Sequence, residues 1–366
     1  VWKTLNYYRR RVRMALCDME VAMPFTSEEL SIAGKTALDY YMKNKPVDQI
    51  VQERPWLSKL MSSKKSMPGA KQNAVVQLRY RYQSNFQFFN GRKVVTYNNR
   101  STIEQATYPW RSAHDGFALD EDRLLQNGVT VTDNKKAVHS DAEVIQLTNL
   151  LDEQIAVLDA GWDEQFDQKL LADGSASTDD IEGLDFLIAT APTSGTVGGI
   201  DRSVSANSWW RNQVATGITT ATTTGTVLDV METQWRNCTR NGGRPNYIMA
   251  GTDFVDGYRN FILKTYSRVN IDAGSQFAAE LGNSGLHFKG VPIVWNPTFD
   301  DLGGTWAKRC YFLNMNYIYM KEIDGQGKIS RKPPRPYDRY EHYWGLSWRG
   351  ALCMSRANAH AVLVHA

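Results

Sequence analysis

The densest groups of potentially reactive side chains in this sequence are two clusters of carboxylates. Asp120, Glu121 and Asp122 are consecutive, and the second cluster comprises Asp179, Asp180, Glu182 and Asp185. Paired carboxylates can perform general acid–base catalysis or bind Ca²⁺. Both clusters lie in or beside predicted turns, and neither has the spacing of an EF-hand loop. We therefore interpret them as solvated or ion-paired side chains.

Two glycine-containing segments match parts of nucleotide-binding motifs, but neither match is complete. The first, Gly34-Lys35-Thr36, has the ending of a P-loop, yet Glu29 stands where that motif requires its first glycine. The second, Gly325-Gln326-Gly327, has Ser330 in place of the third glycine of the dinucleotide fingerprint, and no strand-to-helix junction is predicted around it. We interpret both as chance matches that predict no nucleotide site.

The histidines and cysteines do not have the spacing of a metal site or a nucleophilic site. The sequence contains no HExxH motif for zinc and no GxSxG motif for a serine nucleophile. His360 and His365 are five residues apart in a predicted strand, so their side chains point to opposite faces. The cysteines include no CxxC pair, and we expect buried thiols in a reducing compartment for Cys17, Cys238, Cys310 and Cys353. The sequence therefore predicts no catalytic, cofactor-binding or metal-binding residues.

Composition indicates a large globular protein that is rich in aromatic residues with a polar group. The 366 residues are 42% hydrophobic and 22% charged, and the formal net charge of +3 is too small for a dedicated nucleic-acid-binding protein. The 11 tryptophans and 17 tyrosines are of types favoured at subunit interfaces, although a large aromatic core would also explain them. No apolar run of about 18 residues predicts a membrane span, and no signal peptide is recognised.

The first 70 residues have the pattern of an extended arm. A basic cluster near the start comprises Arg9, Arg10, Arg11 and Arg13. A short helix is expected over residues 27–43, because Thr26 or Ser27 can cap it, and prolines interrupt the remainder.

Residues 74–98 give the clearest β pattern of the chain. Apolar residues alternate with polar ones, as in a strand with one buried face, at Val76, Leu78, Tyr80 and Tyr82. Asn90-Gly91 is the preferred pair for a two-residue type I′ turn, so we predict a long hairpin with aromatic residues near its tip. Because an isolated hairpin is only marginally stable in water, this one should lie on another surface, such as that of a neighbouring subunit.

Residues 140–174 carry the strongest helical signal. Ser140 and Glu143 form a capping box, and Asp173-Gly174 ends the pattern. Apolar residues follow at spacings of three and four, at Val144, Leu147, Leu151, Ile155, Leu158, Trp162, Phe166 and Leu170. At 1.5 Å per residue this helix is roughly 50 Å long and needs a long surface to pack against. A coiled coil is the alternative, although no further heptads follow.

The region 175–225 is rich in loop-forming residues, and an alternation of helices and strands follows it. We expect helices at about 227–241 and 253–264. Strands are expected at 247–250, 291–295, 310–319 and 359–364, with an aromatic segment at 340–348. This mixture predicts an α+β fold class.

Six segments, taken in order, resemble one group of tailed-bacteriophage major capsid proteins. They are Gln52-Glu-Arg-Pro-Trp56, Lys64-Lys65-Ser66-Met67-Pro68-Gly69, Phe88-Phe-Asn-Gly91, Ala106-Thr-Tyr-Pro-Trp-Arg111, Gly195-Thr-Val-Gly-Gly-Ile-Asp-Arg202 and Trp209-Trp210-Arg211-Asn212. None of these segments is a catalytic motif. The resemblance is specific because the six segments occur together in this order. It extends from about residue 45 to the end of the chain.

The resemblance implies the HK-ninety-seven-like (Johnson) capsid fold. Its parts would be an N-terminal arm at 1–70, an extended β-hairpin loop at 71–112, a peripheral domain at 113–214 and 326–366 with a long spine helix at 140–174, and an axial domain at 215–325. Thr219–Thr224 would be an axial-domain loop near the symmetry axis of each capsomer.

The resemblance also implies a structural subunit and not an enzyme. Such subunits self-assemble into pentamers and hexamers of an icosahedral head around double-stranded DNA, in the host bacterial cytoplasm, and become the virion capsid after procapsid maturation. Scaffolding protein and portal would be partners, with a decoration protein as an optional one. We expect inter-subunit contacts from Phe88, Phe89, Asn90, Gly91, Arg92, Lys93 and Val94 at the hairpin tip. We expect non-specific contacts to packaged DNA from Arg9, Arg10, Arg11 and Arg13.

Other interpretations stay open at this level. The nearest is an encapsulin-type bacterial nanocompartment shell protein, followed by a DNA-binding protein that uses the basic arm and by a hydrolase with an unrecognised carboxylate site. The hairpin aromatics could also pack within their own subunit. Some relatives join subunits through a Lys–Asn isopeptide bond, but nothing identifies an asparagine partner for Lys93, so we do not predict a cross-link.

Overall fold

The computed structural model describes residues 52–68, 72–82, 84–120, 122, 141–219, 227–240, 242–266, 286–333 and 341–366, with the backbone alone for 141–152 and 263–266. The chain divides into two compact units, Val1–Gln52 and Glu53–Ala366, and every described helix and strand lies in the second. Several predictions fall outside the described residues. They concern the basic cluster Arg9–Arg13, the helix over 27–43, Cys17, the Ser140 capping box and most of Thr219–Thr224.

A five-stranded sheet is built around one long strand, β14 (Glu341–Met354). Its partners are β4 (Arg111–Asp120), β12 (Ile318–Ile323) and β13 (Ile329–Arg331), all antiparallel to it, and β1 (Lys65–Met67) joins β12 in parallel. The aromatic segment predicted at 340–348 is therefore a strand. It is long because β4 pairs with its first ten residues and β12 with its last five.

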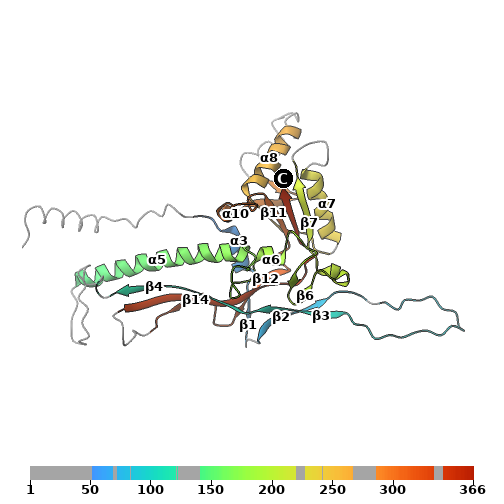
Figure 1. Ribbon diagram of the computed structural model, residues 1–366, viewed down its shortest axis with the longest axis horizontal. Helices are drawn as coiled ribbons and strands as arrows, with labels where there is room; N and C mark the ends of the chain where they lie inside the picture. The colour runs from blue at the N-terminus through green and yellow to red at the C-terminus, as the bar shows by residue number, and fades with distance from the viewer. Residues whose placement is uncertain are drawn as a thin grey trace, which may run out of the picture. The chain divides into compact units, whose positions relative to one another are not determined.

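Helix α5 (Asp141–Leu171) runs alongside β4 and β14 (Figure 1). Its 31 residues correspond to roughly 46 Å at 1.5 Å per residue. The C-terminal half of the predicted apolar stripe is buried, at Leu158, Trp162, Phe166 and Leu170. The ring of Phe166 meets that of Trp348 on β14 edge to face, with centroids 4.8 Å apart. The long helix is thus confirmed, and the surface that it needs is the five-stranded sheet.

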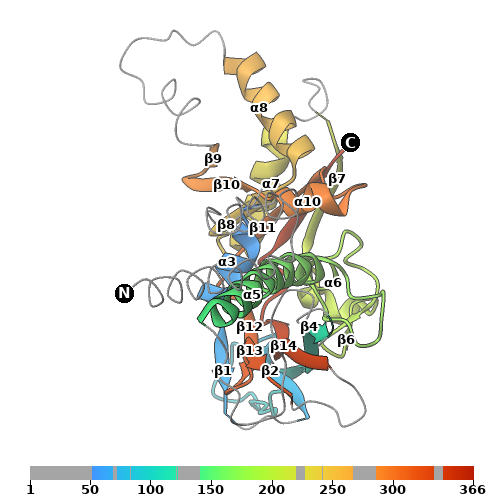
Figure 2. The same ribbon diagram turned by 90° about the vertical axis from the view of Figure 1, so that its left-hand side faces the viewer.

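A six-stranded mixed sheet forms the second core. In spatial order its strands are β7 (Gln213–Ile218), β15 (Ala361–His365), β11 (Arg309–Leu313), β8 (Tyr247–Ala250), β10 (Val291–Trp295) and β9 (His287–Phe288). Helices α7 (Val227–Arg240), α8 (Thr252–Tyr266) and α10 (Pro297–Leu302) lie near it (Figure 2). The rings of Trp235, Phe288 and Phe312 pack together in this core. The predicted α+β class is confirmed.

The strand predicted over 310–319 is wrong, because the segment forms two strands in different sheets. β11 ends at Leu313, and Asn314 then begins a turn. The Asn314 carbonyl accepts from the Tyr317 N–H at 3.0 Å, and its side-chain oxygen accepts from the Asn316 N–H at 3.0 Å. This Asx turn redirects the chain so that β12 enters the five-stranded sheet.

The two C-terminal strands also separate. We expected both to return to the domain that holds the long helix, but β14 lies in the five-stranded sheet and β15 in the six-stranded sheet. β15 pairs with β11, a strand of the predicted axial segment, through four residue pairs. The division of the chain into arm, loop, peripheral and axial domains stays a prediction.

The end of the predicted arm packs into the core. Helix α3 (Pro55–Ser62) buries Trp56 and Leu60 completely. The N-cap residue of α3, Arg54, makes no side-chain hydrogen bond to the first turn. Instead the fully buried carboxylate of Asp167 on α5 accepts a hydrogen bond from the Leu57 N–H at 3.1 Å. The other Asp167 oxygen accepts from the Thr298 hydroxyl at 2.6 Å, so one side chain links α3, α5 and α10.

The predicted loop-rich region contains short elements around one buried arginine. These are α6 (Leu184–Leu187), β5 (Thr196–Val197), β6 (Ile200–Asp201) and the 3₁₀ helix η2 (Ser205–Trp210). Arg202 is completely buried and donates to the carbonyls of Trp210 and Leu187. Burial without a carboxylate partner lowers its pKa to about 10.

Candidate inter-subunit surfaces

A long loop projects from a two-stranded ribbon that is anchored to the core. The ribbon pairs β2 (Asn73–Arg79) with β3 (Ile103–Pro109), and its inner face buries Ala74, Val76, Leu78, Ala106 and Tyr108. The Tyr108 hydroxyl donates to the Met354 carbonyl at 2.9 Å. The Lys321 ammonium donates to the Val75 carbonyl at 3.0 Å. These bonds tie the base of the loop to the five-stranded sheet.

The loop spans residues 80–102, and we call it the extended loop. Its two arms run side by side away from the ribbon (Figure 1). At the base the Tyr80 N–H donates to the Thr102 carbonyl at 3.2 Å, and Tyr80 stacks on Trp209 with ring centroids 5.2 Å apart. Farther out, Gln87 donates to the Thr96 carbonyl at 3.3 Å. Regular strands nevertheless end at Arg79 and resume at Ile103, so the predicted hairpin is confirmed only as a pair of extended arms.

The turn at the tip differs from the predicted type I′ turn. The Lys93 N–H donates to the Asn90 carbonyl at 2.9 Å, which places Gly91 and Arg92 at the two central positions. A type I′ turn on Asn90-Gly91 would need positive φ at both residues, and neither has it. The turn is therefore one residue later than predicted.

The predicted contact residues at the tip are exposed. The exposed fractions of Phe88, Phe89 and Val94 are 85%, 66% and 84%. Asn90, Gly91, Arg92 and Lys93 are exposed as well. In the part of the chain that the structure describes, these aromatics therefore do not pack into their own subunit, and the inter-subunit contact stays a prediction. The extended loop gathers all seven predicted tip residues, whereas Arg9, Arg10, Arg11 and Arg13 lie outside the described residues.

Sequence reasoning missed further members of this surface. The predicted alternation of buried and exposed residues is confirmed as far as Leu78. The same pattern predicted that Tyr82 would lie on the buried face, but Tyr82 is exposed. Among the described residues ten large hydrophobic side chains are exposed, and six lie in the extended loop: Tyr82, Phe86, Phe88, Phe89, Val94 and Tyr97. One signal was available, because residues 80–102 contain four cations and no carboxylate. The extended loop is thus an apolar, basic surface that the other described residues leave exposed.

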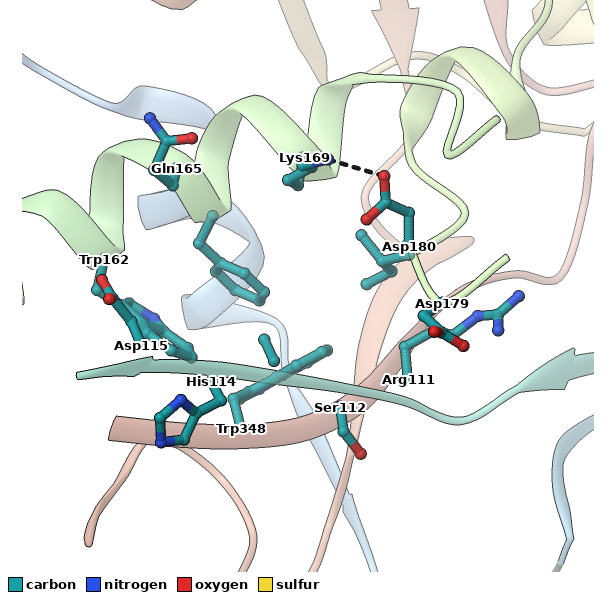
Figure 3. Close-up of a pocket in the computed structure, with 13 residues that line it drawn as sticks. Arg111, Ser112, His114, Asp115, Trp162, Gln165, Lys169, Asp179, Asp180 and Trp348 are labelled. Carbon is teal, nitrogen blue, oxygen red and sulfur yellow. Dashed lines mark hydrogen bonds and ion pairs between the residues drawn. The ribbon is translucent and has the colours of Figure 1, made fainter. Parts of the chain in front are cut away.

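A hollow of about 430 Å³ lies between α5 and the sheet (Figure 3). Trp162 and Phe166 of α5 and Trp348 of β14 form its apolar floor, and Asp115 and Asp179 are at its rim. Lys169 reaches across from α5 to Asp180, with 2.7 Å between the ammonium and a carboxylate oxygen.

Two of the four carboxylates in the second cluster are ion-paired, whereas one oxygen of Glu182 is buried without a hydrogen-bond partner among the described residues, unlike the predicted solvated or ion-paired state. Asp180 pairs with Lys169, and Asp185 pairs with Arg309 at 2.8 Å. Glu182 is half-buried, and desolvation raises the pKa of its carboxyl while Arg111 lowers it in part. No group of three or more His, Cys, Asp or Glu side chains among the described residues could hold a metal ion.

The described thiols and His360 lie in the core, whereas His365 is only half-buried. Cys238, Cys310 and Cys353 are buried and unbridged, and desolvation raises the pKa of Cys238 and of Cys353 to about 12. His360 is fully buried, and its Nδ1 accepts the Asn314 N–H at 3.2 Å. Burial lowers the pKa of His360 to about 3, so it is neutral at pH 7. In the part of the chain that the structure describes, no helix is long and apolar enough to cross a membrane.

Comparison with solved structures places this architecture among phage capsid proteins. The capsid subunit of cyanophage A-1(L) is 17% identical, with a TM-score of 0.59 over 90% of this chain and 98% of that chain. The capsid of Myoviridae phage XM1 is 14% identical, with a TM-score of 0.52 over 89% of this chain and 98% of that chain. The capsid of a native GTA particle is 13% identical, with a TM-score of 0.52 over 90% of this chain and 98% of that chain. No family model and no curated protein sequence matches the chain. At these identities the likeness establishes the fold, and it confirms the resemblance at that level.

Proposed function

We propose that this chain is the shell-building subunit of a tailed-phage head, which assembles into pentamers and hexamers of an icosahedral capsid around double-stranded DNA. Two independent features support the proposal. The fold is shared with capsid subunits over about nine tenths of the chain. The extended loop carries an apolar surface of a kind that monomeric soluble proteins rarely expose.

The exposed aromatic residues of the extended loop are the observation that carries the proposal. Full burial of a large apolar side chain contributes roughly 1.5–3 kcal/mol. Six such side chains are exposed on the loop of a single subunit, so each copy can stabilise a contact with another copy through them. In the proposed capsid the extended loop of one subunit lies across its neighbour, with Phe88, Phe89 and Val94 buried in the contact.

Such a contact is heterologous, because the loop of each subunit meets a different surface of the next. Heterologous contacts generate rings when the rotation between subunits closes. Pentamers and hexamers are rings of this kind, and the same contact recurs throughout a shell. The firm base of the loop suits this role, since Tyr108 and Lys321 fix its direction relative to the five-stranded sheet.

The remaining parts of the proposal concern partners and location. Arg9, Arg10, Arg11 and Arg13 would neutralise phosphates of packaged DNA without reading its sequence. Scaffolding protein and portal would act during assembly in the host cytoplasm, and a decoration protein would bind the finished shell where one exists. The mature location would be the virion capsid.

Negative-stain electron microscopy of the purified protein, expressed with and without its neighbouring genes, tests the proposal. We expect closed particles or capsomer-sized rings, and nuclease-protected DNA in particles made during infection. A protein that stays monomeric under every condition, including with its scaffold candidate, would contradict the proposal. Closed particles that enclose protein cargo and no DNA would instead indicate an encapsulin-type compartment.

A further inference from the structure

The face of the β4–β14 ribbon that points away from α5 carries charges that form no ion pair with the other described residues. Exposure alternates along β4, and Ser112, His114, Gly116, Ala118 and Asp120 form the exposed set. Figure 3 shows Ser112 and His114 on the side of β4 opposite to α5. The register places Arg349 beside Ser112 at one end of this face and Glu341 beside Asp120 at the other. We call these the basic end and the acidic end of the ribbon.

The basic end is a hollow of about 590 Å³ with three cations at its edge. They are Arg331, Lys332 and Arg349, and no carboxylate lines the hollow. Arg331 is oriented by the Ser347 hydroxyl at 2.8 Å and by the Gln326 side-chain oxygen at 3.0 Å, both of them neutral acceptors. Lys332 lines the edge of the hollow, but its ammonium lies over the ring of Trp344, 4.0 Å from the centroid, and Trp344 pairs with Phe117 on the α5 side of the ribbon. None of the three forms an ion pair within the described residues.

Glycines keep the floor of this face low. Gly116 lies directly opposite Gly345 in the register. A Cβ at Gly345 would be 2.9 Å from Nε2 of His114, and one at Gly116 would be 2.7 Å from the Trp344 carbonyl oxygen. Side chains at either position would displace the imidazole or the strand. The face is therefore open enough to receive a segment of another molecule.

The acidic end contains a like-charge pair. Asp120 and Glu341 are directly opposite each other in the antiparallel register, an arrangement that destabilises a sheet unless a cation compensates it. The Tyr343 hydroxyl donates to the Glu341 carboxylate, and the Asp122 N–H donates to Asp120 at 3.4 Å. No cation of the described chain is within ion-pair distance of either carboxylate.

One copy cannot pair its own two ends. Glu341 and Arg349 are eight residues apart on one strand, which corresponds to roughly 27 Å at 3.4 Å per residue. A neighbouring copy can bring opposite charges together at both ends. We infer that the acidic end of one subunit binds the basic end of the next, as a second heterologous contact beside the extended loop. This inference rests on the proposed function, because it requires the subunits to assemble.

Charge reversal with rescue tests the inference. One variant is Arg331→Glu with Arg349→Glu, which reverses the two cations on the side of the ribbon away from α5. The second is Asp120→Lys with Glu341→Lys, and the third combines all four changes. We expect each reversal alone to reduce the assembled fraction about tenfold, because like charges then meet. The combined variant should recover assembly, since every contact again pairs opposite charges. Arg259→Glu, at an exposed site on α8, is the control for an altered surface charge.

Sedimentation of assembled and free subunits, with thermal melting to verify folding, gives the readout. Reversal variants that assemble like the wild type would overturn the inference. A folded combined variant that fails to assemble would overturn it too, and would indicate that the basic end binds another anion, such as nucleic-acid phosphate. The result that contradicts the proposed function is a different one, because in that case the wild-type protein itself would form no closed particles. Self-association of that wild type at low salt would still test the contact, and a strict monomer would contradict it.

Discussion

Phe88 and Phe89 interact with solvent in one subunit and with a neighbour in the proposed assembly. Because both are exposed, Phe88→Ala and Phe89→Ala should change the free energy of unfolding of the subunit by no more than about 0.5 kcal/mol. Loss of buried interfacial aromatics should abolish or deform assembly. Melting curves and sedimentation of both variants check this prediction.

Phe299→Ala is the matched control for these variants. Phe299 is completely buried against Trp306 and Tyr311, so its truncation should destabilise the subunit by about 3–5 kcal/mol. Loop variants that assemble normally would show that the hairpin contact is assigned to the wrong residues. Loop variants as unstable as Phe299→Ala would show that the loop packs on its own subunit.

Asp167 connects three elements, and its removal should be costly. Asp167→Ala leaves the Leu57 N–H and the Thr298 hydroxyl buried without acceptors, at about 1–3 kcal/mol for each group. Chemical denaturation measures the loss. The control is Asp163→Ala on the same helix, because its exposed pair with Lys328 is worth at most about 1 kcal/mol. Equal effects of the two substitutions would contradict the linking role of Asp167.

His360 should make the subunit sensitive to acid. Burial lowers its pKa from 6.5 to about 3, so folding favours the neutral ring. This contribution to stability is fully present above pH 6.5 and is lost as the pH falls from 6.5 toward 3. In His360→Gln, the amide oxygen can accept the Asn314 N–H without titrating. The variant should lose less stability than the wild type between pH 7 and pH 5, as measured by denaturation. Parallel pH profiles would contradict this account.

At the scale of elements, the extended loop should be separable from the fold. The β2–β3 ribbon keeps its seven residue pairs when residues 82–100 are replaced by a short turn. We expect this variant to melt like the wild type and to remain unassembled. Light scattering and calorimetry measure the two properties. Assembly of the shortened protein would show that the loop makes no essential contact.

The predictability of each element depended on whether local sequence decided its structure. β8 and β10 match the predicted bounds, because each is a short apolar run with clear breaks on both sides. β7 was missed, since its polar and glycine-containing sequence is ordered by parallel pairing with β15, far away in the chain. The 310–319 segment was misread because the side chain of Asn314 makes a turn that hydrophobicity does not reveal.

The same distinction applies to the site. The sequence identified the tip residues, because Asn-Gly flanked by aromatic residues is a local signal. The exposure of Tyr82 depends on where the β2–β3 ladder stops, which no alternation pattern contains. The charge separation on the β4–β14 ribbon could not be predicted either, since it depends on strand register.

At the scale of the whole molecule, a net charge of +3 conceals segregated charges. The extended loop has four cations and no carboxylate, whereas α5 has eight carboxylates and one lysine. Attraction between oppositely charged surfaces of different copies accelerates association and is screened by salt. Assembly should therefore slow as NaCl rises from about 50 to 500 mM, where the Debye length shortens severalfold. Time-resolved light scattering checks this, and an increase in rate would mean that like charges meet at the contacts.

A cryo-electron microscopy map of the assembled particle tests the central claim most directly. The account predicts that the extended loop of each subunit lies on a neighbouring subunit, with Phe88, Phe89 and Val94 buried in that contact. Density that places the loop on its own subunit, or projecting into solvent with these side chains exposed, would contradict it.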